Sequence, residues 1–159
     1  MKTAIIYVSK HGTTESTALK IQKGLGEKTT QLFNLKNINK IDLLEFDQII
    51  IGGSIHAGMI QNRIKDFYSK NMTTLLEKPL GLFISCFYEG ETAQSQLEKS
   101  YPEILRKHAK SCKVMGGEML IEKMNFFEKL IVKKVAGISE SDSKINHENI
   151  QLFINEMSN

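Results

Sequence analysis

The sequence predicts an α/β fold in which a doubly wound, five-stranded parallel sheet carries helices on both faces. Strand-like and helix-like segments alternate along the chain, which is typical of parallel strands connected by helices. The third strand-like segment contains the consecutive residues Ile49, Ile50 and Ile51, as expected of a strand that is buried on both faces. The 159 residues, 41% hydrophobic and 25% charged, suit a single globular domain spanning residues 1–159.

The order of the elements follows from hydrophobic spacing and from chain-breaking residues. Short apolar runs predict strands at residues 3–9, 29–35, 46–54, 79–86 and 112–121. Apolar residues at helical spacing predict helices at residues 14–25, 64–76, 93–109 and 146–157. Gly26 ends the first helix, and Pro79 opens the fourth strand. Ligands of such sheets bind beyond the carboxyl ends of the strands, so we expect a site in the loops after the first, third and fourth strands.

The first of these loops has the sequence SKHGTT and leads from the first strand into the first helix. The backbone N–H groups at a helix N-terminus have no intrahelical partners, and such a site suits a phosphate. Glycine lets the backbone approach closely, three hydroxyls can donate, and the lysine and histidine could add charge. The candidate phosphate ligands are Ser9, Lys10, His11, Gly12, Thr13 and Thr14. The alternative is an ordinary turn with a threonine N-cap, and the absence of P-loop and Rossmann motifs disfavours ATP and NAD.

This loop, followed by Glu15, resembles the flavodoxin phosphate loop, (S/T)-x-T-G-x-T, with His11 in place of a threonine. Residues 52–54 at the end of the third strand, and residues 85–93 after the fourth, fall where flavodoxins place the two loops that sandwich the flavin ring. The sequence is therefore similar to the flavodoxin family in three loops in register. The resemblance implies a flavodoxin-like fold and FMN as the cofactor.

The second loop is expected to face the edge of the flavin ring. Its candidate residues are Ser54, Ile55, His56, Ala57 and Gly58. A flavin needs backbone groups at its edge and at least one residue that can take a positive φ, which favours the peptides of residues 56–58. Ile55 or Met59 is expected to cover the ring, and His56 could equally be an exposed loop histidine without a role.

The third loop offers two aromatic side chains. Its candidate residues are Ser85, Cys86, Phe87, Tyr88, Glu89 and Gly90. One of the two aromatic residues could stack on the flavin ring; we expect Phe87 in the core, which leaves Tyr88 for stacking. Cys86 has no visible base, so a nucleophilic role is disfavoured.

Residues 122–143 form a segment that short flavodoxins lack between the fifth strand and the last helix. Its apolar residues recur at helical spacing with lysines between them, namely Phe127, Leu130, Ile131, Val135 and Ile138 with Lys129, Lys133 and Lys134. One interpretation is a helix that buries its apolar face on the sheet. The others are a helix that lies in a membrane interface, or one that walls a pocket beside the flavin.

This segment and the positive net charge resemble the menaquinone-dependent protoporphyrinogen oxidase family, whose members are flavodoxin-like and basic. Residues 51–70, IGGSIHAGMIQNRIKDFYSK, are also similar to that family's stretch around the second flavin loop. The resemblance implies an FMN enzyme that oxidises a porphyrinogen and passes the electrons to a quinone. The alternatives are a flavodoxin that carries electrons to a redox partner protein, and a flavodoxin-like binding domain without redox chemistry.

Composition limits the compartment and the partners. The net charge of +3 and the pI near 8.8 are mildly basic, without the dense lysine and arginine clusters of a nucleic-acid binder. Cys86 and Cys112 are too few for a disulfide framework, and no metal-ligand spacing stands out. No apolar run reaches the roughly 18 to 20 residues that span a bilayer. We therefore expect a cytoplasmic protein without a metal or a nucleic-acid partner. Under the membrane-interface interpretation of residues 122–138, it would also make peripheral contact at the inner face of the membrane.

Overall fold

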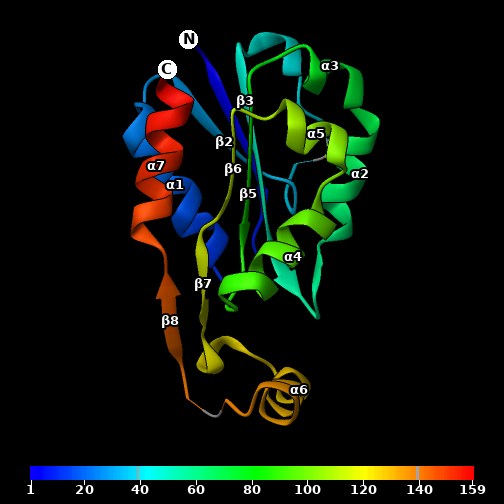
Figure 1. Cartoon of the computed structure of the whole chain (residues 1–159), viewed down its shortest axis with the longest axis vertical. Coiled ribbons are helices and arrows are strands. Elements are labelled where there is room, and N and C mark those ends of the chain that lie inside the picture. Colours follow the sequence, from blue (N-terminus) through cyan, green and yellow to red (C-terminus); the bar gives the residue numbers. More distant parts are fainter. Residues whose placement is uncertain (39, 139) are drawn as a thin grey trace.

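The computed structural model describes residues 1–38, 40–138 and 140–159 and shows an α/β protein built on a parallel sheet (Figure 1). In spatial order its five main strands are β2 (Thr30–Asn34), β1 (Thr3–Val8), β3 (Gln48–His56), β5 (Leu80–Ser85) and β6 (Ser111–Val114). All four pairings between them are parallel. A short strand, β4 (Met59–Ile60), pairs antiparallel with the end of β3. The predicted doubly wound, five-stranded parallel sheet is confirmed.

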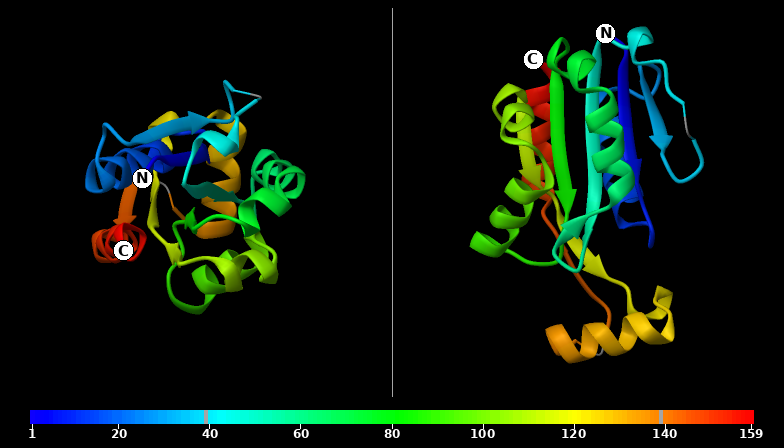
Figure 2. Two further views of the ribbon diagram at one scale, coloured as in Figure 1. Left: turned by 90° about the horizontal axis from the view of Figure 1, so that it is seen from above. Right: turned by 90° about the vertical axis from the view of Figure 1, so that its right-hand side faces the viewer.

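Helices cover both faces of this sheet (Figure 2). One face carries α1 (Thr13–Leu25) and α7 (His147–Ser158), and the other carries α2 (Asn62–Lys70), α3 (Met72–Leu76), α4 (Gly90–Ser100) and α5 (Glu103–His108). Ile49 and Ile51 belong to the buried cluster under α2 to α5, and Ile50 to the cluster under α1 and α7. Because both faces are covered, each isoleucine is fully buried, which stabilises the fold by about 1.5–3 kcal/mol per side chain.

Two predicted helices are each divided in two. Residues 64–76 form α2 and α3, which meet at Asn71. Residues 93–109 form α4 and α5, which are separated at Tyr101 and Pro102. Tyr101 has φ −128° and ψ 138° because the residue before a proline is forced out of the helical conformation. A short 3-10 helix, η1 (Leu43–Glu45), precedes β3.

The predicted fifth strand, residues 112–121, is wrong in its extent because the chain forms two strands there. After β6, the strand β7 (Gly116–Met119) leaves the sheet and pairs antiparallel with β8 (Asp142–Ile145). Gly116 makes this change of direction with φ +72°, and a Cβ at this position would overlap the carbonyl oxygen of Lys144. Only glycine fits both conditions.

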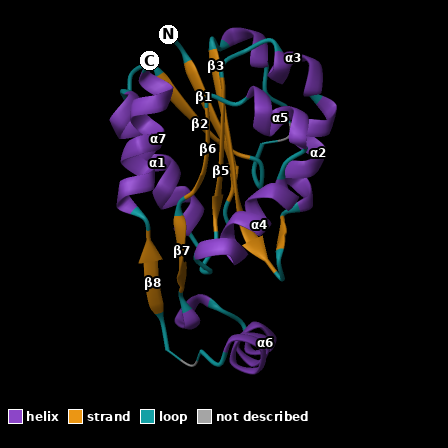
Figure 3. Cartoon of the chain, viewed as in Figure 1, coloured by secondary structure: helices purple, strands orange, loops and turns teal. Residues whose placement is uncertain are grey.

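The ribbon of β7 and β8 carries a further helix beyond the carboxyl end of the sheet (Figure 3). A turn of 3-10 helix, η2 (Ile121–Lys123), leads into α6 (Phe126–Ala136), and we call residues 116–145 the insert. In the capping box of α6, the Asn125 side chain accepts from the Glu128 N–H, and the Glu128 carboxylate accepts from the Asn125 N–H. Phe126 and Phe127 are 70% and 74% exposed, so the interpretation of a helix packed on the sheet is wrong. Within the predicted segment 122–143, residue 139 lies outside the described residues.

Candidate functional site

A cavity of about 620 Å³ opens at the carboxyl end of the sheet, between the loops that follow β1, β3 and β5 on one side and α6 on the other. The predicted site residues that line it are Ser9, Lys10, His11, Thr13, Thr14, Ser54, Ile55, His56, Ala57, Gly58, Ser85, Cys86, Phe87 and Tyr88. Gly12 is not part of this lining, and Glu89 and Gly90 line a second cavity. The structure therefore gathers all but three of the predicted residues around one cavity.

The loop after β1 places a helix N-terminus at one end of this cavity. Gly12 has φ +97°, and α1 begins at the next residue, so the N–H groups of the first helical turn have no intrahelical partners. The N–H of Gly12 donates to Ser9 Oγ at 3.1 Å, which fixes the turn. The cap position belongs to Gly12, without a side-chain hydrogen bond, so the alternative of a threonine N-cap is wrong.

Three buried polar atoms of the cavity lining have no hydrogen-bond partner among the described residues. They are Thr14 Oγ1, Ser85 Oγ and Gln96 Oε1, and their residues are 1%, 3% and 8% exposed. Leaving such an atom unpaired costs about 1–3 kcal/mol, so native structures rarely do it without a reason. Their residues all line one cavity, so a polar ligand bound there is suited to complete their hydrogen bonding.

The loop after β3 turns sharply at the mouth of the cavity. Ala57 has φ +49° and Gly58 has φ +76°, a backbone conformation that alanine adopts only under constraint. Both residues line the cavity, at the place that we expected for the edge of the ring. Ile55 lines the cavity, whereas Met59 is 58% exposed and lies outside the lining. Ile55 is therefore the apolar cover on this side.

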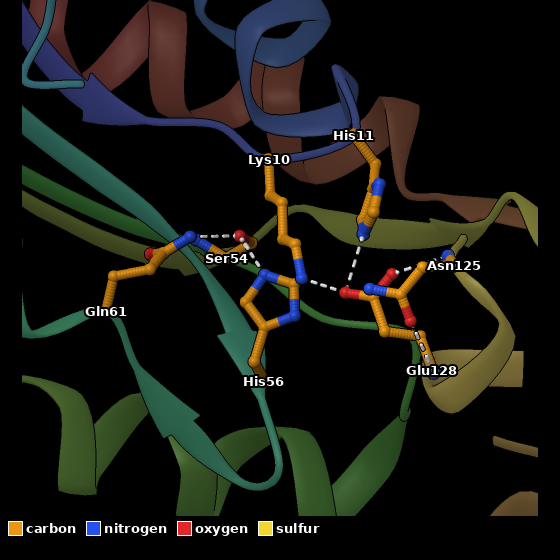
Figure 4. A network of polar contacts seen from close by, with 7 residues as sticks. All are labelled: Lys10, His11, Ser54, His56, Gln61, Asn125 and Glu128. Atoms are coloured by element: carbon orange, nitrogen blue, oxygen red, sulfur yellow. Dashed lines mark hydrogen bonds and ion pairs between the residues drawn. The ribbon is translucent and has the colours of Figure 1, made fainter. Parts of the chain in front are cut away.

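His56 belongs to a hydrogen-bonded chain with Ser54 and Gln61 (Figure 4). Its Nε2 lies 3.0 Å from Ser54 Oγ, the Ser54 N–H donates to Gln61 Oε1 at 3.0 Å, and the Gln61 amide donates back to Ser54 Oγ. The ring of His11 stands edge-on at 6.2 Å. Burial first, and then the charge of Lys10, lowers the pKa of both histidines. Both imidazoles therefore favour the neutral form and offer one donor and one acceptor each.

The loop after β5 supplies the aromatic lining. The expectation that Phe87 lies in the core is wrong: β5 ends at Ser85, so Phe87 lies beyond the packed layer, half-buried in the cavity wall. The ammonium of Lys144 lies 4.7 Å from the centre of its ring. Tyr88 also lines the cavity and is 44% exposed. Burial raises the pKa of Cys86 to about 11, so its thiol stays protonated and is a poor nucleophile.

The insert supplies the opposite wall. Its lining residues are Gly117, Glu118, Met119, Met124, Ile131, Val132 and Val135. A Cβ at Gly117 would lie 2.6 Å from the backbone carbon of Cys86, so glycine allows β7 to approach the third loop this closely. The pocket-wall interpretation of this segment agrees with the structure. Helical spacing alone could not identify which residues face the cavity.

Polar contacts tie the insert to the loop after β1 (Figure 4). Glu128 on α6 forms an ion pair with Lys10, and its carboxylate lies 3.7 Å from His11 Nε2. On β7, Glu118 accepts a hydrogen bond from the Thr13 hydroxyl at 3.2 Å. These contacts hold α6 over the cavity without burying it.

The arrangement fits a flavin mononucleotide. The unpaired Thr14 hydroxyl and the free N–H groups of α1 suit a phosphate, while the turn at Ala57 and the aromatic third loop suit the two sides and the edge of a flat ring. The site lies where the strand order β2-β1-β3-β5-β6 reverses direction, which defines a doubly wound α/β protein with a nucleotide site at its switch point. Residues 4–146 match the family described as flavodoxin domain, and the chain belongs to that family. The family confirms FMN as the predicted cofactor.

Individual relatives are distant. A curated relative from Escherichia coli K12, protoporphyrinogen IX dehydrogenase (quinone), is 24% identical over 158 residues, covering 91% of this chain and 84% of the relative. Among solved structures, a flavodoxin from the domain Archaea is 18% identical with a TM-score of 0.56, covering 99% of this chain and 94% of its own. Oxidised flavodoxin 1 from Bacillus cereus is 18% identical with a TM-score of 0.57, covering 99% and 95%. These structures support the fold.

Proposed function

We propose that this protein is an FMN-dependent oxidoreductase that oxidises a porphyrinogen-type substrate with a quinone as the electron acceptor. The observation that carries the proposal is the apolar wall that α6 adds opposite the flavin loops, because a large, mostly apolar substrate needs such a surface beside the flavin. The Escherichia coli relative, which bears the name of a quinone-linked protoporphyrinogen IX dehydrogenase, supports the same reaction class.

The three loops divide the binding of FMN between them. The phosphate is assigned to residues 9–14, with Thr14 and the N–H groups of α1 as its main donors. The ring is assigned to the space between residues 54–58 and residues 85–88, with Tyr88 as the stacking residue and Ile55 as the cover on the other side. When bound, FMN supplies the two-electron chemistry that connects substrate and acceptor.

The chain's own side chains would bind the substrate and handle its protons. Met119, Met124 and Ile131 line the cavity opposite the flavin loops and would exclude water from the apolar substrate. Oxidation of a porphyrinogen releases protons, and neutral His56 can take one. The Ser54 hydroxyl beside it can donate to a neutral Nε2 or accept from a protonated one, so it stabilises both forms of the imidazole.

The outer face of α6 is proposed to contact the anionic membrane surface in which the quinone is dissolved. Phe126, Phe127 and Leu130 are exposed apolar residues, and Lys129, Lys133 and Lys134 beside them are exposed cations. An amphipathic helix of this kind lies in the interface plane, and each lysine near an anionic leaflet contributes about 1 kcal/mol. None of the helices in residues 1–38, 40–138 and 140–159 is long and apolar enough to cross a bilayer, so this contact would be peripheral.

A charge-reversal experiment tests the membrane contact. The triple variant Lys129→Glu, Lys133→Glu, Lys134→Glu should keep FMN but lose binding to anionic vesicles and reduction of vesicle-borne menaquinone, most clearly at low salt. Reduction of a soluble quinone analogue should change little. The matched control reverses Lys20, Lys23 and Lys28, exposed lysines of α1 and the turn after it, and has the same net charge. Equal vesicle binding by the two triple variants would contradict the proposed contact.

Turnover tests the reaction itself. Purified protein with FMN should oxidise a porphyrinogen anaerobically when menaquinone is present, and the Ile131→Asp variant should lose this activity while retaining FMN. The competing function is an electron carrier, which the similarity of the fold to flavodoxins over 99% of the chain favours. Rapid reduction by a ferredoxin-type reductase without porphyrinogen oxidation would establish the carrier and reject the enzyme.

A further inference from the structure

The insert brings a cation to the loop that follows β1, close to residues that line the cavity. Lys123, in η2, extends to the loop after β1, where its ammonium donates to the carbonyl oxygen of His11 at 3.4 Å. The same nitrogen lies 3.8 Å from the position that a Cβ would occupy on Gly12. Gly12 is the residue whose turn exposes the N–H groups of α1. Lys123 therefore lies at the helix N-terminus to which we assign the phosphate.

Two other charged residues near this turn have polar partners of their own. Lys10 forms an ion pair with Glu128, and Glu118 accepts hydrogen bonds from Thr13 and Ser143. No ion pair involves Lys123 in the part of the chain that the structure describes. Its charge is nevertheless close enough to His11 to help lower the pKa of that imidazole, with a smaller effect than burial or Lys10. A cation held at an anion site without a carboxylate partner has its charge available for a ligand.

A second observation points to an anion at the same place. The Thr14 hydroxyl is buried, lines the cavity at the first turn of α1 and has no partner among the described residues. It can donate to a phosphate from one side while an ammonium approaches from the insert side. Neutral donors of the loop fix the position of the phosphate, and one cation stabilises the bound dianion electrostatically.

We propose that Lys123 binds the phosphate of FMN and is thus a ligand that the insert adds to the phosphate loop. The ammonium moves from the His11 carbonyl to the phosphate oxygens when FMN binds. Because only Met124 and Asn125 separate Lys123 from the start of α6, binding of the phosphate and the observed position of α6 stabilise each other. The inference rests on the proposed phosphate loop and does not depend on the identity of the substrate.

Titration of the apoprotein with FMN and with riboflavin, which lacks the phosphate, tests the assignment. Lys123→Gln should weaken FMN about tenfold at low salt, less at high salt, and leave riboflavin unchanged, because only the phosphate interaction is lost. The matched control, Lys129→Gln, removes an exposed lysine of the same insert and should change neither ligand. The phosphorus resonance of bound FMN should shift in Lys123→Gln and stay in place in Lys129→Gln.

The possible outcomes distinguish failure of the role proposed for Lys123 from failure of the phosphate-loop assignment. If the parent protein prefers FMN over riboflavin and Lys123→Gln keeps that preference in full, the role of Lys123 is refuted and the phosphate loop stands. If Lys123→Gln weakens both ligands equally, Lys123 supports the insert and is no phosphate ligand. If the parent binds FMN no better than riboflavin, the phosphate loop itself is refuted, and the inference falls with it.

Discussion

Replacing Thr14 with valine removes a hydroxyl and keeps the shape of the side chain. In the ligand-free protein this hydroxyl is buried and unpaired among the described residues. Its removal eliminates a desolvation cost of about 1–3 kcal/mol, so the free energy of unfolding should stay constant or rise. With FMN bound, the same change removes a hydrogen bond to a charged group worth about 1.5–3 kcal/mol, which weakens FMN about 10- to 150-fold. Stability and affinity should therefore move in opposite directions.

Thr30 provides the matched control, since its hydroxyl is also buried and unpaired in the described part of the chain but lies at the start of β2, at the opposite end of the strands from the cavity. Thermal unfolding of the apoproteins, followed by titration with FMN and riboflavin, measures both effects. Thr30→Val should leave FMN affinity unchanged, and Thr14→Val should weaken FMN but not riboflavin. The reasoning is refuted if apo Thr14→Val is less stable than the parent by 1 kcal/mol or more, or if its affinity for FMN is unchanged.

Three further outcomes follow from the structure. Tyr88→Ala should restore part of the fluorescence that a stacked flavin loses, with little change in stability because the side chain is 44% exposed, and an unchanged emission would contradict stacking. Because the pKa of His11 and of His56 is lowered by folding, the unfolded chain binds more protons than the folded protein below pH 6.5, so this contribution to stability is complete above pH 6.5 and is lost as the pH falls through the folded pKa. A variant with asparagine at both positions should show a free energy of unfolding that depends less on pH in this range. Gly116→Ala should loosen the β7–β8 ribbon and reduce the protection of its amides from hydrogen exchange more than Gly137→Ala does, because both positions have positive φ but only the first would overlap a backbone carbonyl.

The sheet and the three loops could be predicted because their signals are local. Ile49, Ile50 and Ile51 identify a strand covered on both faces, and the resemblance to flavodoxins depends on short stretches that keep their order along the chain. Parallel strands bring their carboxyl ends to one edge, so loops that are far apart in sequence meet at one cavity. Topology thus converts three local predictions into a site.

The rest depends on contacts between distant residues. The pairing of β7 with β8 joins residues 116–119 to residues 142–145, and the hydrophobic pattern of neither segment predicts this pairing. The predicted core position of Phe87 is wrong for a related reason: the chain leaves the sheet at Ser85, and the point at which a strand ends depends on its neighbours. The ion pair of Lys10 with Glu128 joins residues that are 118 positions apart, so sequence patterns could not indicate it.

The position of α6 bears on the choice between an enzyme and an electron carrier. A carrier brings its flavin edge to a partner protein, and a specific protein interface covers about 800 Å² on each side. Here Ile131, Val132 and Val135 of α6 line the space beside the flavin loops, so a partner that approaches from this end meets the helix before it meets the ring. An apolar substrate, which is far smaller than a partner protein, can instead enter between α6 and the loops. The same helix presents Phe126 and Phe127 to the outside, where quinone in a bilayer would be reached. In the proposed enzyme, the inner face of α6 would contact the substrate and its outer face would contact the membrane that holds the quinone, whereas a soluble carrier needs neither contact.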